Sequence, residues 1–249
     1  MTRAGRLRLI VIIAAIAMLE AACRTGLIPS ITMIPPSTMV TALVDLLRSG
    51  KFATDIIATL SNVSIAIVAA MIAGVLIGTA LHSRPFARRI LDPLFATYYA
   101  VPMYAFYPLL IVVLGLGDLP QVAIGFLLAV MAVIINTLNG LDRVPQVLLK
   151  AARVHRLSGI KTALRIRLPH AAPYLFTGFK LAVAYSFIGV IGAEFITSSR
   201  GIGYEISFAY NNFDNALMYA LILLVLIVVI TINMSLHTWE KRLLARRGK

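Results

Sequence analysis

The sequence predicts an all-α membrane protein with six membrane-spanning helices, and its composition and hydrophobic runs support this. Of the 249 residues, 60% are hydrophobic and 13% are charged, and the mean hydropathy is +0.90. A soluble globular chain needs more polar surface than this composition offers. The apolar residues also form several runs of about 20, which is the length that a helix needs to cross a bilayer.

The basic residues predict how the chain is oriented. The net charge of +13 and the pI near 10.4 would suggest nucleic-acid binding in a soluble protein. Here, however, lysine and arginine gather in short segments between apolar runs. With both termini in the cytoplasm, 18 of the 23 basic residues lie inside and 4 lie outside, as the positive-inside rule requires. We therefore expect membrane lipid, and not nucleic acid, around the chain.

Residues 1–54 are expected to form the first span and an outer amphipathic segment. The span covers Leu7–Ile28, and Glu20 argues against reading this run as a cleaved signal peptide. Prolines then break the helix. We expect Ser37 to cap a short helix that Gly50 ends and that carries its apolar residues on one face: Met39, Leu43, Leu46 and Leu47.

Residues 55–240 are expected to form the core region, with five further spans. Gly74 and Gly78 have the four-residue spacing that lets membrane helices approach closely. The third span contains Pro93, Pro102 and Pro108, which predict a broken helix. Broken helices in transporters often line the pathway, although neighbouring helices can also absorb such prolines. The candidates for the translocation path are Tyr99, Pro102, Met103 and Tyr107.

The fifth span, Ala171 to about Glu194, contains two charged residues, Lys180 and Glu194. An ionisable residue within a membrane span is a functional candidate by default. Glu194 falls near the outer end of the span, where it can bond backbone groups of the following turn. We expect that structural role over direct solute contact, but we keep Glu194 among the candidates for the translocation path.

A strongly basic segment, Lys150–Pro169, lies between the fourth and fifth spans. Its cations would each cost several kcal/mol in hydrocarbon, so the segment must lie in water; they are Lys150, Arg153, Arg156, Lys161, Arg165 and Arg167. Ala151 and Ala152 are expected in a short helix that Ser158-Gly159 ends. Leu168-Pro169 should begin the next helix.

This segment resembles the cytoplasmic "EAA" loop of ABC-importer permeases. That pattern reads E-A-A, three residues, G, nine residues, I, any residue, L-P, and five positions match it: Ala151, Ala152, Ile166, Leu168 and Pro169. Two positions depart, since Lys150 stands where the family has an acid and Arg156 where it has glycine. The sequence that follows, PYLFTGFKLAVAYSFIGVIGAEFITSSRGIGYEI, is similar to the nitrate, sulfonate and taurine branch.

The resemblance implies the fold of a type I importer and a single transmembrane permease domain over residues 1–249, in which 55–240 form the core transport region with a coupling loop at 140–170. Such a permease forms the translocation path for a small, anionic or polar solute in the inner or plasma membrane of a prokaryote. Its implied partners are an ABC ATPase subunit, which binds ATP and Mg²⁺, an extracytoplasmic solute-binding protein and a second copy of the chain. The implied ATPase-coupling residues are Lys150, Ala151, Ala152, Arg156, Leu157, Ser158, Gly159, Leu168 and Pro169.

The sequence offers no catalytic residues or cofactor site of its own. It has no phosphate-binding G-x-x-x-x-G-K-[ST] motif, and its 4 histidines do not have metal-ligand spacing. We therefore expect a transport subunit and not an enzyme. The alternative of an ion-coupled transporter would need inverted repeats and charged midplane residues, and we see neither in the sequence. A membrane-embedded lipid-modifying enzyme, the less favoured alternative, would need a cluster of acids or histidines at an aqueous face, whereas the inner loops offer mainly lysine and arginine.

Overall fold

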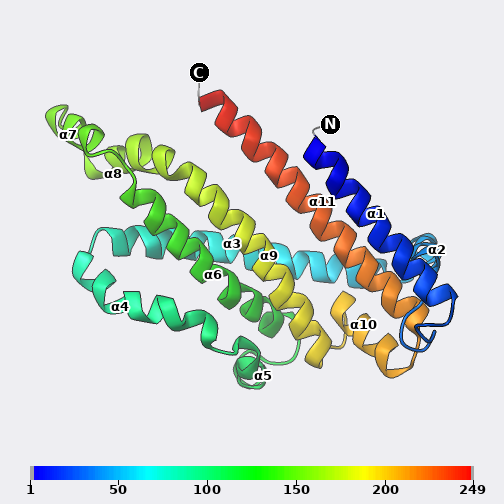
Figure 1. Ribbon diagram of the computed structural model, residues 1–249. Coiled ribbons are helices and arrows are strands. Elements are labelled where there is room, and N and C mark those ends of the chain that lie inside the picture. The colour runs from blue at the N-terminus through cyan, green and yellow to red at the C-terminus, as the bar shows by residue number, and fades with distance from the viewer. Residues whose placement is uncertain (1–2, 248–249) are drawn as a thin grey trace. The chain divides into compact units, whose positions relative to one another are not determined.

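The computed structural model describes residues 3–247, which form helices joined by short turns, as Figure 1 shows. The described part contains no strand, which confirms the all-α prediction. The chain divides into two compact units, and each is described by itself. Among the described residues, unit 1 comprises 3–58 and 194–228, and unit 2 comprises 59–193 and 229–247.

Unit 1 is built around a small apolar core. Its elements are α1 (Arg3–Arg24), α2 (Pro36–Ser49), the first residues of α3 (Ala53–His82), α10 (Ile202–Asn211) and the first part of α11 (Asn215–Arg247). The core joins α2, α10, α11 and the turn between α2 and α3. Its buried residues are Leu43, Leu46, Phe52, Ile202, Ile206, Ala220, Leu221 and Leu224. Burying these side chains stabilises the unit, because apolar packing compensates for the ordering of the short helices.

Helix α2 confirms most of the predicted amphipathic segment. Met39, Leu43 and Leu46 are buried, whereas Leu47 is 53% exposed and does not belong to the buried face. Gly50 ends the helix with a left-handed φ of 64°, as predicted.

The expected capping role of Ser37 is wrong. Helix α2 begins at Pro36, so Ser37 already lies within it. The backbone N–H of Ser37 donates to Oε2 of Glu20 at 3.0 Å. Glu20, which also pairs with Arg24, therefore supplies the acceptor that the start of the helix needs.

Unit 2 holds most of the apolar length of the chain. Its remaining elements are α4 (Pro85–Thr97), η1 (Tyr98–Ala100), η2 (Met103–Phe106), α5 (Tyr107–Leu114), α6 (Asp118–Asp142), α7 (Gln146–Val154), α8 (Gly159–Thr162), the π-helical turn η3 (Ala163–Arg167) and α9 (Leu168–Thr197). The main core lies on α3, α6 and α9 and includes Ala70, Leu81, Val130, Val133, Ile134, Leu138 and Ala182.

Glycines let these three helices approach closely. A Cβ added at Gly74 would lie 2.5 Å from Cβ of Val133, and one added at Gly78 would lie 2.7 Å from Cβ of Thr137. A Cβ at Gly189 would lie 2.6 Å from Cα of Gly125. The glycine pair predicted to allow close packing therefore serves the contact between α3 and α6 within this chain.

The structure supports only part of the six-span prediction. Among the described residues, four stretches are long and apolar enough to cross a membrane: Ala53–His82, Asp118–Asp142, Gly159–Thr197 and Asn215–Lys241. Pro85–Ala100 and Met103–Leu114 form a pair bent by 89°, which would be a fifth. This bend confirms the predicted broken helix. The expected first span, α1, is not among them.

Candidate functional site

The basic segment comprises the second half of α7, then α8, η3 and the first two residues of α9. Figure 1 shows α7 and α8 beyond the end of α6. Helix α7 ends at Val154 because Arg156 turns the chain with a left-handed φ of 51°. The N–H of Leu157 then donates to the carbonyl oxygen of Ala152 at 3.0 Å. The expected helix end at Ser158-Gly159 is therefore wrong, because an arginine adopts the conformation that we assigned to glycine.

Ser158 begins a helix and does not end one. Its backbone is extended, and its Oγ accepts a hydrogen bond from the N–H of Lys161 at 3.3 Å, so it caps α8. Gly159 is the first residue of α8. Leu168 begins α9 with Pro169 in its first turn, as predicted.

The two alanines of α7 differ in their surroundings. Ala151 is exposed, whereas Ala152 is only 3% exposed and packs against the chain itself. The small side chain at 152 is thus needed within the chain. Ala151 remains available to a partner. Of the other coupling candidates, Leu157 and Leu168 are partly buried, and the exposed ones are Lys150, Arg156, Ser158, Gly159 and Pro169.

The cations of the basic segment have no acidic partner in the described part of the chain. The ion pairs found there involve other cations, and the sequence has no Asp or Glu between Asp142 and Glu194. Cations without acids beside them repel one another and attract an acidic surface.

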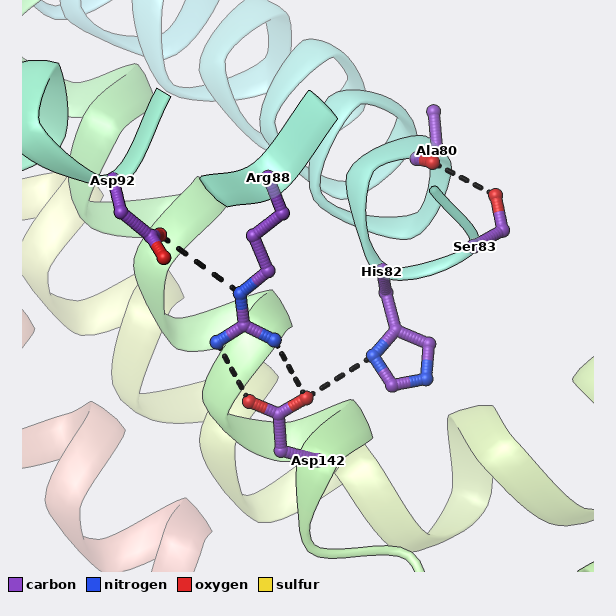
Figure 2. Close-up of polar contacts among 6 residues, drawn as sticks. All are labelled: Ala80, His82, Ser83, Arg88, Asp92 and Asp142. Atoms are coloured by element: carbon purple, nitrogen blue, oxygen red, sulfur yellow. Dashed lines mark hydrogen bonds and ion pairs between the residues drawn. The ribbon is translucent and has the colours of Figure 1, made fainter. Parts of the chain in front are cut away.

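An ion-pair cluster holds the end of α6, just before the basic segment. Figure 2 shows Arg88 and His82 converging on the Asp142 carboxylate. The Nη1 and Nη2 atoms of Arg88 donate to Oδ1 and Oδ2 of Asp142, both at 2.8 Å. Nδ1 of His82 lies 3.2 Å from Oδ1 of Asp142, and Nε of Arg88 lies 3.9 Å from Oδ1 of Asp92. The last residue of α6 is therefore fixed to the end of α3 and the first turns of α4.

Sequence reasoning missed this cluster. The available signal was Asp142 itself, since an acid at the last residue of a helix is unfavourable beside the negative end of the helix dipole. Such a residue needs a cation nearby. Which of the many arginines supplies it depends on how α4 and α6 pack, and Arg88 is 54 residues away in sequence.

The start of α9 holds the end of α6 from another side. The Arg143 guanidinium lies 5.4 Å from the centre of the Tyr174 ring, a cation–π distance. A Cβ at Gly140 would lie 2.9 Å from Cβ of Tyr174 and 3.0 Å from Cβ of Ala171. The two helices that flank the basic segment, α6 before it and α9 after it, are thus packed against each other.

The candidates for the translocation path are not alike in exposure. Met103 is 6% exposed and Tyr107 is 2% exposed, so both pack inside the chain. Tyr99 is 44% exposed and stacks on Tyr185 with 5.5 Å between ring centres, and Pro102 is exposed. Of the four candidates in the broken segment, Tyr99 and Pro102 therefore remain accessible at the bend.

Glu194 bonds backbone at the beginning of α10. It is 1% exposed, and its Oε2 accepts a hydrogen bond from the N–H of Gly203 at 3.0 Å. The carboxyl group lies so close to Gly201, which has a φ of 104°, that a Cβ there would lie 2.5 Å from Cδ of Glu194. The N-terminus of a helix stabilises such a buried anion.

Lys180, the other charge of the fifth predicted span, is also paired. Its Nζ donates to Oε2 of Glu240 at 2.7 Å, which joins α9 to the last part of α11. The sequence did not reveal this partner, because 60 residues separate the two.

Comparisons with known proteins place these features in context. The profile of a family described as "Binding-protein-dependent transport system inner membrane component" matches residues 66–249. The chain is 32% identical over 179 residues to the nitrate import permease protein NrtB of Leptolyngbya laminosa, which covers 72% of this chain and 64% of that protein. It is 27% identical to the taurine transport system permease protein TauC of Escherichia coli (strain K12), over 77% of this chain and 70% of that one.

Other similarities agree with these. The bicarbonate transport system permease protein CmpB of Synechococcus elongatus is 32% identical over 67% of this chain and 60% of its own length. A chain from an inward-facing structure of the MetNI methionine ABC transporter superposes with a TM-score of 0.65. That superposition covers 77% of this chain and 95% of the other at 16% identity, so it supports the fold alone.

Proposed function

Because the chain belongs to the family of inner membrane components of binding-protein-dependent transport systems, we propose that it is the permease subunit of an ATP-driven importer. In this proposal the chain crosses the membrane six times with both termini in the cytoplasm. Two copies line the translocation path, since six helices are too few to enclose one. An ATPase subunit, which holds ATP and Mg²⁺, docks on the basic segment, and an extracytoplasmic binding protein delivers the solute.

One observation carries this proposal: the cations of the basic segment have no acidic partner in the described part of the chain and all but Arg167 are exposed, yet the end of α6 before the segment and the start of α9 after it are held by contacts within unit 2. Such a segment is suited to receive force from a partner. A displacement of α7 would move the end of α6. The ion pair between Arg88 and Asp142 would transmit this movement to α4. Helix α4 leads directly to the 89° bend with Tyr99 and Pro102.

The solute is proposed from the relatives. Their names specify nitrate, taurine and bicarbonate, which are small polar ions. We propose a solute of that class. The bond from Gly203 to Glu194 supports a structural role for this acid, and a carboxylate so engaged does not argue against an anionic solute.

Reconstitution into liposomes tests the proposal. Labelled nitrate, taurine and bicarbonate are offered to vesicles that contain the chain with its ATPase and binding protein, or that lack one of the three. We expect uptake of one solute only with all components and ATP, and no ATP hydrolysis by the chain alone. Uptake by the chain alone along an ion gradient would instead identify an ion-coupled transporter.

A further inference from the structure

A pocket of about 470 Å³ lies beside α7, between this helix and η3. Its apolar lining includes Leu149 and Ala152, and its polar lining includes Gln146, Arg153, Thr162 and Arg167. The volume is sufficient for one or two side chains of a partner, and it falls within the range of small-ligand sites.

The pocket is cationic. Arg153 and Arg167 both line it, and none of its lining residues is acidic. Nε of Arg167 is withdrawn from solvent and forms no hydrogen bond within the described part of the chain. Because a guanidinium stays charged at any physiological pH, such a group is stabilised when an anion approaches it.

The acidic residues of unit 2 do not pair with the arginines of this pocket. Asp92 and Asp142 lie against Arg88, and Glu240 lies against Lys180. Asp118 begins α6 at the opposite end from Asp142, and a helix of 25 residues separates the two by about 36 Å.

We infer that this pocket receives a carboxylate side chain of the ATPase subunit, held between Arg153 and Arg167. The inference rests on the proposed function. It adds that the ATPase inserts a side chain into the permease, whereas the proposed function only has the permease docking its basic segment on the ATPase. Guanidinium groups bind carboxylates in paired hydrogen bonds. The apolar wall of Leu149 and Ala152 would exclude water around that contact, which strengthens it.

The test measures the affinity of the purified chain, in lipid nanodiscs, for its purified ATPase subunit. The variants are Arg153→Gln, Arg167→Gln and the double variant. Lys161→Gln and Arg165→Gln are matched controls, because both cations are exposed, belong to the same segment and do not line the pocket. A thermal unfolding curve of each variant without the ATPase shows whether the permease fold is retained.

We expect the double variant to lose affinity at least tenfold and each control to lose less than threefold. Salt should weaken the wild-type complex more than the double variant, because ion pairs are screened. A further variant, Ala151→Glu, places a bulky charge on the exposed face of α7 without changing the pocket lining. If the double variant binds as tightly as the wild type while Ala151→Glu prevents binding, the inference is wrong and the docking proposal stands. If none of these changes weakens binding, both are wrong.

Two other occupants are distinguishable with the same variants. Calorimetric titration of the chain with inorganic sulfate, in nanodiscs of neutral lipid and of phosphatidylglycerol, measures small-anion and headgroup binding. Binding of either that needs Arg153 and Arg167, with unchanged affinity for the ATPase, would overturn the inference.

Discussion

At the scale of single residues, Arg156 has a left-handed backbone conformation, which glycine adopts more readily than arginine. Its φ of 51° lies in the left-handed region, where a side chain costs roughly 1 kcal/mol relative to glycine. The resembling pattern has glycine at this position. An arginine that is unfavourable for the local fold and lies exposed on the basic segment is explained if it contacts the ATPase.

Arg156→Gly therefore separates stability from docking. We expect the melting temperature of the chain to stay the same or rise, by an amount equivalent to at most about 1 kcal/mol. The affinity for the ATPase should fall several-fold. Arg156→Lys, which keeps the charge, is the control. Unchanged affinity in Arg156→Gly would mean that this cation only orients the chain in the membrane.

Arg88→Gln removes the bidentate partner of Asp142. The pair is partly exposed, so its loss should lower the free energy of unfolding by only about 1 kcal/mol. Uptake in the reconstituted system should fall much more than that, while ATP hydrolysis continues, because α4 no longer follows the end of α6. The exchanged pair Arg88→Asp with Asp142→Arg should restore part of the uptake. Equal losses of uptake and hydrolysis would contradict this coupling role.

At the scale of elements, the close packing of α3 on α6 depends on glycine. Gly78→Ala would bring a methyl group to 2.7 Å from Cβ of Thr137, so we expect a destabilisation of about 1–3 kcal/mol. Gly159→Ala is the control, since no atom lies within 4 Å of its added Cβ. Thermal unfolding in detergent measures both. Equal melting temperatures would show that α3 and α6 are less tightly packed than described.

Glu205, which lies in α10, should make the stability of the fold depend on pH. Burial raises the pKa of the Glu205 carboxyl, and the negative charge of Asp55 raises it further, while Lys51 opposes this. A carboxyl with a raised pKa is most favourable to folding when protonated, so its contribution is full at low pH and is lost as the pH rises through the folded pKa. Glu205→Gln should thus be more stable than the wild type at pH 7, and the difference should vanish below pH 4, near the unfolded carboxyl pKa of about 4.3. A difference that grows on acidification would contradict this.

The elements also show where sequence reasoning succeeds. Prolines restrict the backbone locally, so the broken helix near Pro102 could be predicted, and so could the start of α9 at Leu168-Pro169. The end of α7 could not, because the rule that assigns left-handed conformations to glycine fails at Arg156. Ala152 was correctly predicted to lie in a short helix, but its burial by the chain itself depends on how α7 packs.

At the scale of the whole molecule, composition was sufficient for the class of protein and the basic motif for the family, which the profile match over residues 66–249 confirms. The contacts that fix the basic segment were beyond prediction. Asp142 pairs with Arg88 across 54 residues, and Lys180 pairs with Glu240 across 60. Such pairs depend on the packing of distant helices, and no spacing in the sequence specifies them.

The central claim, that the basic segment contacts the ATPase, is tested most directly by photocrosslinking from a single cysteine. The chain has 1 cysteine, Cys23. In a Cys23→Ser background, Ala151→Cys places a benzophenone label on the exposed face of α7. Val112→Cys, which is 82% exposed on α5, is the control. We predict that illumination of the assembled transporter joins the label at 151, but not the label at 112, to the ATPase. An ATPase that remains unlabelled from 151 in a transport-active complex would contradict the account.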